Sequence, residues 1–144
     1  MSQLTNIAQV QDFDFIVAIT RGGLIPAFLI ARLTNIRNVD TFICQSYEDD
    51  HTKVDLSYFP KNYSHLRGQK VLIIDELAET GDTLRLAVEK IQESMPAKVA
   101  TMVVFRKEST QFEPDYYIHS VGDEWINFKY DEVELEGIID YITK

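Results

Sequence analysis

Apolar residues gather in short unbroken runs, and several of these runs are followed by the spacing of an amphipathic helix. Residues 71–74 are four branched apolar residues in succession, which is typical of a parallel strand buried on both faces of a sheet. Runs and helical spacing of these kinds predict the following elements: strands at 13–20, 39–47, 71–74, 98–105 and 114–121, and helices at 24–33 and from about 84 to 91. The pattern therefore predicts an α/β fold with a mainly parallel sheet flanked by helices.

Two acids and a polar turn follow the strand at 71–74. Asp75 and Glu76 come at its carboxyl end, where open α/β sheets bind ligands. Residues 80–83 form a Gly-containing turn that opens the next helix, and a helix N-terminus presents free N–H groups to anions. Carboxylates accept hydrogen bonds from hydroxyls and hold Mg²⁺. The stretch therefore suits a ribose phosphate; a buried strand followed by an ordinary capped helix is the alternative interpretation.

A second strand–glycine–helix unit lies near the start of the chain. Arg21, Gly22 and Gly23 separate the strand at 13–20 from the helix at 24–33. One interpretation is a plain β–α connection, because glycine commonly marks tight turns. The other is an anion-contacting loop, in which Arg21 supplies positive charge and glycine lets the backbone approach closely.

The central stretch resembles the diphosphosugar-binding signature of the type I phosphoribosyltransferases: four apolar residues, two acids, two spacers, an acid and Thr-Gly-x-Thr. The resemblance implies that Asp75 and Glu76 bind the ribose hydroxyls and a metal ion. It implies that Glu79, where the family usually has Asp, lies near the base as the catalytic proton acceptor. Glu76 likewise stands where the second acid is usually Asp. The implied substrate contacts of this stretch come from Asp75, Glu76, Leu77, Ala78, Thr80, Gly81, Asp82 and Thr83.

The glycine loop and a lysine extend the resemblance to the 6-oxopurine enzymes of the family. Those enzymes carry a similar Ser/Thr-Arg-Gly-Gly loop, which implies that Arg21 and Gly22 contact the pyrophosphate. They also place a lysine where Lys107 follows the strand at 98–105, and this lysine donates to the 6-oxo group. A lysine is a donor only, so it favours a carbonyl over the amino group of adenine. A solvated charge at the strand end is the alternative for Lys107.

Trp125, the only tryptophan, is either a core-filling residue or a flat stacking surface for a base. The resemblance favours stacking, with the backbone of Ile126 contacting the purine edge. Asp131, six residues after the tryptophan, is implied to hold a metal bound to pyrophosphate through water. These positions predict a small C-terminal base-binding segment beside the sheet.

The activity implied by the resemblance is purine salvage. The 5-phosphoribosyl group of phosphoribosyl diphosphate would pass to guanine, xanthine or hypoxanthine with Mg²⁺ as cofactor, giving a nucleoside 5′-monophosphate and pyrophosphate. A non-catalytic or regulatory nucleotide-binding domain of the same fold is one alternative, because Glu76 and Glu79 depart from the usual residues. Another base specificity, for example for a pyrimidine, is a second alternative.

Length, charge and cysteine content limit the remaining possibilities. The 144 residues suit a single domain spanning residues 1–144. The net charge of −9 repels nucleic acid phosphates, so no nucleic acid partner is expected. Cys44 is the only cysteine, which excludes an intrachain disulfide and fits a cytoplasmic location; within its strand it is interpreted as a small core residue. The N-terminus lacks a signal-peptide pattern, and no apolar run approaches the roughly 20 residues of a membrane span.

Two polar or amphipathic segments complete the sequence. Residues 48–68 mix polar and aromatic side chains and predict a functional loop, such as a lid with short strands. The tail at 131–142 spaces its apolar residues along one helical face. That face could pack on the protein's own core or on another subunit, and the protein is expected to form a homo-oligomer.

Overall fold

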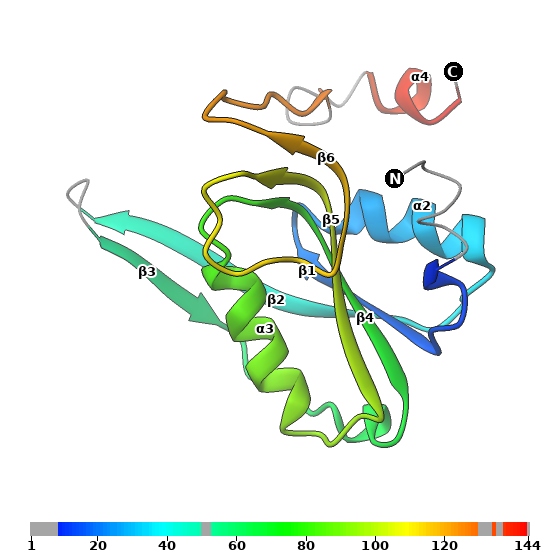
Figure 1. Ribbon diagram of the computed structural model, residues 1–144. Coiled ribbons are helices and arrows are strands. Elements are labelled where there is room, and N and C mark those ends of the chain that lie inside the picture. The colour runs from blue at the N-terminus through cyan, green and yellow to red at the C-terminus, as the bar shows by residue number, and fades with distance from the viewer. Residues whose placement is uncertain (1–8, 50–52, 130–133, 135–136, 144) are drawn as a thin grey trace.

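A computed structural model describes residues 9–49, 53–129, 134 and 137–143. In chain order its elements are β1 (Phe15–Thr20), α2 (Leu24–Thr34), β2 (Val39–Asp49), β3 (Lys53–Tyr58), the 3-10 helix η1 (Ser64–Leu66), β4 (Lys70–Ala78), α3 (Asp82–Gln92), β5 (Lys98–Lys107), β6 (Tyr116–Val121) and α4 (Ile138–Thr143). The strands form one six-stranded sheet in the order β3-β2-β1-β4-β5-β6 (Figure 1). Strands β2, β1, β4, β5 and β6 run parallel, and β3 is antiparallel to β2. The predicted mainly parallel α/β sheet is confirmed.

Two hydrophobic clusters show why the central strands are unbroken apolar runs. Val17 and Ile19 of β1 belong to one cluster with Leu84 of α3, called the α3 cluster below. Ile16 and Ala18 belong to the other, the α2 cluster, with Ala27 and Ile30 of α2. Helices thus cover both faces, so successive side chains of one strand are all buried. Burying a side chain of this size stabilises the fold by about 1.5–3 kcal/mol.

Strands β4 and β5 continue past the apolar runs that predicted them. Asp75 of β4 pairs with Val103 of β5, and Ala78 pairs with Arg106. Strand β4 therefore carries the acidic pair within its last residues, and β5 runs on to Lys107. Backbone ladder bonds need no apolar side chain, so both strands continue through polar residues.

The segment predicted as a functional loop, residues 48–68, contains the end of β2, strand β3 and η1. Strands β2 and β3 form a hairpin that extends beyond the rest of the sheet at the left of Figure 1. Leu56 of β3 lies on the side of the hairpin that faces α3 and packs against its cluster. The segment thus has more regular structure than its polar composition indicated.

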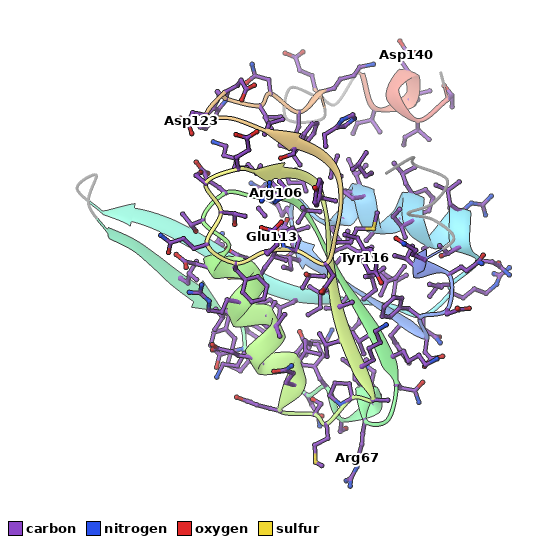
Figure 2. The ribbon with its side chains drawn as sticks, in the orientation of Figure 1. Arg67, Arg106, Glu113, Tyr116, Asp123 and Asp140 are labelled. Carbon is purple, nitrogen blue, oxygen red and sulfur yellow. The ribbon has the colours of Figure 1, made fainter. Side chains whose placement is uncertain are left out.

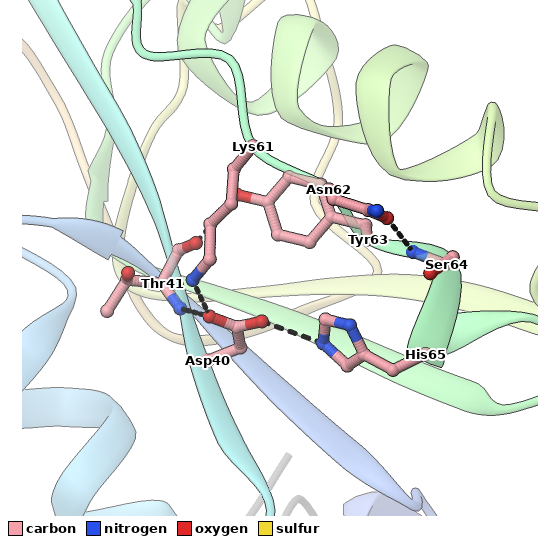
Figure 3. Close-up of polar contacts among 7 residues, drawn as sticks. All are labelled: Asp40, Thr41, Lys61, Asn62, Tyr63, Ser64 and His65. Carbon is pink, nitrogen blue, oxygen red and sulfur yellow. Dashed lines mark hydrogen bonds and ion pairs between the residues drawn. The ribbon is translucent and has the colours of Figure 1, made fainter.

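A polar cluster around Asp40 fixes the chain that follows this hairpin (Figure 3). One Asp40 carboxylate oxygen accepts hydrogen bonds from the Thr41 N–H, at 2.7 Å, and from Lys61, and the other lies 2.8 Å from His65 Nε2. The Tyr63 hydroxyl donates to the Thr41 carbonyl at 2.7 Å. Although burial opposes ionisation, the bonds with Lys61, Thr41 and His65 hold the pKa of Asp40 below its usual value. Residues 61–65 are therefore tied to the start of β2.

Two expectations outside the sheet can also be compared with the structure. Cys44 is buried in the α3 cluster, as its interpretation as a core residue requires. The tail helix α4 begins at Ile138, and Ile139 and Ile142 are largely exposed, so they do not pack on the protein's own core. In the part of the chain that the structure describes, no helix is both long enough and apolar enough to span a membrane.

Candidate active site

A cavity of about 310 Å³ opens at the carboxyl end of β4. Strand β4, the turn that follows it and the start of α3 supply nearly all of its wall, and β3 supplies Leu56. The lining residues are Leu56, Asp75, Glu76, Leu77, Ala78, Glu79, Thr80, Gly81, Asp82, Thr83 and Leu84. The structure therefore brings the whole predicted stretch from Asp75 to Thr83 around one hollow.

The turn before α3 has the geometry of an anion-binding helix N-terminus. Gly81 caps the helix with φ +89° and ψ 0°, a left-handed conformation that favours glycine. The first helical hydrogen bond runs from the Arg85 N–H to the Gly81 carbonyl at 3.0 Å, and the Asp82 N–H lies 3.3 Å from the Thr80 hydroxyl oxygen. The N–H groups of the first helical turn have no carbonyl partner within the helix, so the turn can bind a phosphate.

The carboxyl of Asp75 lies where its negative charge is disfavoured. The Glu76 N–H donates to a carboxylate oxygen of Asp75 at 2.8 Å. Burial, opposed by this hydrogen bond and assisted by the charge of Glu76, raises the pKa of Asp75 to about 7. A divalent cation at this position would remove most of that unfavourable charge, because it binds carboxylate oxygen directly.

The donor set at the cavity fits a hard cation only in part. Asp75 and Glu76 offer the oxygen ligands that Mg²⁺ prefers. Within residues 9–49, 53–129, 134 and 137–143, no group of three or more His, Cys, Asp or Glu side chains is arranged to hold a metal. Asp131, the third predicted ligand, lies outside the described residues. A cation bound by the acidic pair would therefore take further oxygens from substrate and water.

The glycine loop after β1 lies against the acidic pair. A Cβ placed on Gly22 would stand 2.4 Å from the Glu76 carboxyl carbon, so the loop and this acid are in close contact. The peptide bond between Thr20 and Arg21 is cis, and Arg21 is exposed to solvent at the loop surface. The glycine loop after β1 and the acidic pair of β4, far apart in the sequence, therefore meet at Glu76.

Lys107 and Glu79 form an ion pair at the edge of the cavity. The Lys107 ammonium lies 3.1 Å from a Glu79 carboxylate oxygen. Only 8% of Lys107 is exposed, whereas 59% of the Glu79 side chain is. Lys107 is thus not the solvated strand-end charge of the alternative interpretation. The residue expected to contact the base and the residue expected to accept its proton are direct neighbours.

Trp125 and Ile126 lie on the segment after β6. Trp125 is 82% exposed, so the interpretation as a core residue is wrong. Its indole N–H donates to the Asn127 side-chain oxygen at 3.0 Å. Phe128 packs edge-on against Phe105 of β5, with ring centroids 5.8 Å apart, and this contact attaches the segment beside the strand that carries Lys107. An exposed indole is available to stack on a planar ligand.

The sequence pattern of the phosphoribosyl transferase domain matches residues 5–134. The chain belongs to the phosphoribosyltransferase family. Among similar proteins, a xanthine-guanine phosphoribosyltransferase from Chromohalobacter salexigens is 39% identical over 134 residues, which cover 92% of this chain and 78% of that protein. The enzyme of the same name from Vibrio vulnificus is 32% identical over 114 residues, 79% of this chain and 70% of that protein.

Solved structures agree with this family assignment at the level of the fold. The purine phosphoribosyltransferase from Pyrococcus horikoshii has a TM-score of 0.78 and 22% identity, covering 92% of this chain and 88% of that one. The xanthine-guanine-hypoxanthine phosphoribosyltransferase from Helicobacter pylori has a TM-score of 0.70 and 21% identity, covering 90% and 84%. The predicted type I phosphoribosyltransferase fold is thereby confirmed.

Sequence reasoning missed two residues of this phosphoribosyltransferase, one that lines the cavity and one that packs against its turn. Leu56 lines it from β3, and the alternation of apolar and polar residues over Lys53–Tyr58 could have predicted that strand. Phe112 lies against Gly81 from the loop between β5 and β6. Its signal was an aromatic residue within an otherwise polar turn, which is unusual unless the ring is packed.

Proposed function

We propose that the protein transfers the 5-phosphoribosyl group from phosphoribosyl diphosphate to a 6-oxopurine, giving a nucleoside 5′-monophosphate and pyrophosphate. The observation that carries this proposal is the juxtaposition of the acidic pair, the phosphate-type turn and the Lys107–Glu79 pair around one cavity. Relatives named xanthine-guanine phosphoribosyltransferase support guanine and xanthine as bases. The retained carboxylate at Glu79 gives the non-catalytic alternative no support.

In this proposal the sugar phosphate lies along the cavity from β4 to α3. Residues 79–83 bind the 5′-phosphate through backbone N–H groups, and Asp75 and Glu76 accept hydrogen bonds from the ribose hydroxyls. Leu77 and Ala78 complete the wall between these two sets of contacts. Arg21 and the Gly22 backbone contact the pyrophosphate, where positive charge and N–H donors favour the leaving anion.

The base is proposed to lie between Lys107 and Trp125. Lys107 donates to the 6-oxo group, Trp125 stacks on the ring and the backbone of Ile126 contacts the purine edge. As N9 forms its bond to C1′ and the bond to pyrophosphate breaks, Glu79 accepts or stabilises the proton leaving N7. Closure of the site excludes water that would otherwise attack the cationic sugar.

Mg²⁺ is proposed as the cofactor, held by Asp75, Glu76 and Asp131 together with oxygens of the diphosphosugar. When bound, it neutralises negative charge on the diphosphate. The raised pKa of Asp75 supports this assignment, because a partly buried carboxylate without a counter-charge favours its neutral form.

A base panel tests the proposed reaction. Guanine, xanthine, hypoxanthine, adenine and uracil are each supplied with phosphoribosyl diphosphate and Mg²⁺, and nucleotide formation is followed by chromatography. Nucleotides should form from one or more 6-oxopurines, and little should form from adenine or uracil. Turnover of adenine or uracil in preference to every 6-oxopurine, or no nucleotide from any base, contradicts the proposal.

We also propose that residues 1–144 act as one cytoplasmic domain within a homo-oligomer. Apolar side chains of α2 that are 37–66% exposed support the oligomer, since an uncovered helix face of this kind commonly marks an interface. They are Leu24, Ile25, Phe28, Leu29 and Leu33. Sedimentation equilibrium of the parent and a Phe28→Glu variant tests this: the parent should exceed the monomer mass of 16.6 kDa and the variant should be smaller than the parent.

A further inference from the structure

Three consecutive residues of the turn at 79–83, called the phosphate turn below, are each contacted by one segment, Lys107 to Phe112, which begins at the last residue of β5. Glu79 pairs with the Lys107 ammonium at 3.1 Å. The Thr80 carbonyl accepts a hydrogen bond from the Gln111 N–H at 3.0 Å. Gly81 lies directly against Phe112. The turn that the proposed function assigns to the 5′-phosphate is therefore held by residues 107–112 as well as by β4 and α3, which it connects.

The contact at Gly81 leaves no space between the turn and the loop. A Cβ placed on Gly81 would stand 2.5 Å from the Phe112 Cβ, 2.8 Å from the Phe112 nitrogen and 2.9 Å from the Thr110 hydroxyl oxygen. The Phe112 ring is partly buried against the α3 cluster, and the Arg85 guanidinium lies 5.8 Å from its centre. Phe112 thus packs on both the left-handed residue and the first turn of α3, whose N–H groups would face the phosphate.

The loop that carries Phe112 is itself fixed at both ends (Figure 2). Arg106 makes a two-pronged ion pair with Glu113, one prong of which is 3.0 Å long, and it also donates to the Ser120 hydroxyl at 3.0 Å. Asp115 accepts a hydrogen bond from the Thr101 N–H at 2.8 Å. A two-pronged arginine–carboxylate pair fixes orientation as well as distance, so Phe112 is presented to the turn from a rigid base.

We propose that Phe112 is a positioning residue for the phosphate turn, and that through it the segment carrying Lys107 also sets the geometry with which the turn binds a sugar phosphate. The inference rests on the proposed function for its substrate, and its ligand class is a 5-phosphorylated ribose. The Phe112 ring packs on the α3 cluster and so holds the Phe112 backbone and Cβ against Gly81, which fixes the left-handed turn and the directions of the N–H groups at the start of α3. Loss of this packing weakens phosphate binding in ground state and transition state alike.

The test compares Phe112→Ala, which keeps the Cβ beside Gly81 but removes the ring that packs on the α3 cluster, with Phe112→Leu, which keeps most of the side-chain volume on that cluster. Tyr116→Ala is the matched control, because Tyr116 is also a partly buried aromatic but packs against the α2 cluster. Binding of ribose 5-phosphate is measured by calorimetry, with ribose as the probe that lacks the phosphate. Steady-state kinetics give kcat and the KM for phosphoribosyl diphosphate, and thermal unfolding shows that each variant is folded.

Phe112→Ala should weaken ribose 5-phosphate binding about tenfold and raise the KM for phosphoribosyl diphosphate by a similar factor, with kcat changed less than about twofold, the signature of lost uniform binding. Phe112→Leu should restore most of the loss, and Tyr116→Ala should leave both values near those of the parent. Unchanged ribose 5-phosphate binding in Phe112→Ala overturns the inference, as does an equal loss in Tyr116→Ala. If Phe112→Ala does not fold, Phe112→Val decides: weaker ribose 5-phosphate binding than in Phe112→Leu supports the inference, and equal binding in the two variants contradicts it. A parent without transferase activity that binds ribose 5-phosphate through Phe112 overturns the proposed reaction and retains the positioning role.

Discussion

The β1–α2 and β4–α3 units both pass from a buried strand through glycine into a helix, yet the two turns need glycine for different reasons. Gly23 has an ordinary φ of −75°, but a Cβ there would stand 2.4 Å from the Ile74 carbonyl oxygen. Gly81 has φ +89° and meets a side chain from another loop. At Gly23 a side chain is excluded by the backbone of the sheet, and at Gly81 it is excluded by the left-handed conformation and by Phe112.

The helices after the two turns differ in the residues that they expose. Helix α2 buries Pro26, Ala27 and Ile30 and also exposes apolar residues on its other side. Helix α3 buries Leu84, Ala87 and Ile91, packs Leu86 and Val88 partly against the same cluster, and exposes only polar residues. The first unit therefore adds an apolar surface to its proposed contacts with the pyrophosphate, while the second carries the acidic pair, the turn at 79–83 and the proposed proton acceptor. Substitution of Glu79 in the second unit should change turnover, and substitution of Gly23 in the first should change folding.

The largest effect is expected at Glu79. Glu79→Gln keeps the size of the side chain and removes its proton-accepting charge, so kcat should fall by a factor of roughly 10 to 10⁴, the upper range being typical of a positioned acid–base group. Binding of phosphoribosyl diphosphate should change much less. Stopped-time assays between pH 6 and pH 9 measure the effect, with Glu79→Asp as a control that should retain turnover. Parental rates for Glu79→Gln across this range would show that Glu79 is not the proton acceptor.

Asp75 should make the stability of the metal-free protein depend on pH. Its pKa is raised from 3.8 to about 7 in the folded state, so the folded protein binds more protons than the unfolded chain between these values. The free energy of unfolding should therefore fall as pH rises from about 4 to about 7, with an upper limit of roughly 4 kcal/mol at ~1.36 kcal/mol per pKa unit.

Urea unfolding of the parent and of Asp75→Asn at several pH values checks this prediction. Asp75→Asn has no carboxyl to ionise, so it should be more stable than the parent above about pH 7, and its dependence on pH should be flatter. Parallel pH profiles for the two proteins would mean that Asp75 titrates normally.

Gly23→Ala should destabilise the fold by about 1–3 kcal/mol, the usual range for overpacking. The added Cβ would meet two carbonyl oxygens, those of Ile74 and Ile19, and neither can move without shifting a central strand. Equilibrium urea unfolding measures the loss. Gly137→Ala is the control, because nothing lies within 4 Å of a Cβ at Gly137; equal stability losses in the two variants would rule out the steric explanation.

Gly22→Ala should have the smallest effect on stability, less than about 1 kcal/mol, although it is next to Gly23. Its Cβ would meet the end of the flexible Glu76 side chain, which can rotate away. Moving that carboxylate should raise the KM for phosphoribosyl diphosphate several-fold, by ~1 kcal/mol of binding. The double variant Gly22→Ala with Glu76→Asp shortens the acid and should recover part of the loss. If Gly22→Ala instead unfolds as easily as Gly23→Ala, the distinction between the two glycines is incorrect.

The sequence predicted the parts of this protein that depend on local pattern. Burial of both sheet faces makes the central strands unbroken apolar runs, so β1 and β4 could be read directly, and the turn around Gly81 follows from the order of residue types. The extension of β4 through Asp75 could not be read in this way. It depends on ladder bonds to β5, which polar side chains neither help nor prevent.

Contacts between distant segments account for what the sequence left unpredicted. The position of Phe112 against Gly81 requires the loop after β5 to fold back over the turn after β4, and no spacing in the sequence specifies that distance. The pairing of Lys107 with Glu79 likewise depends on two neighbouring strand ends. Individual roles at the site are proposed from residue chemistry and family resemblance, whereas the contacts among these residues could be found only from the three-dimensional structure.

On the proposed mechanism, the Lys107–Glu79 pair would determine when the protein discriminates between bases. Because water barely reaches the Lys107 ammonium, oxygen atoms of the protein must solvate it, and Glu79 provides one in the free state. On the proposed mechanism, Glu79 loses its negative charge as it takes up the proton from the purine, and this solvation weakens. A 6-oxo group compensates at that moment, while an amino group, which only donates, does not. Part of the preference for an oxopurine would then arise during the reaction, after the base has already bound.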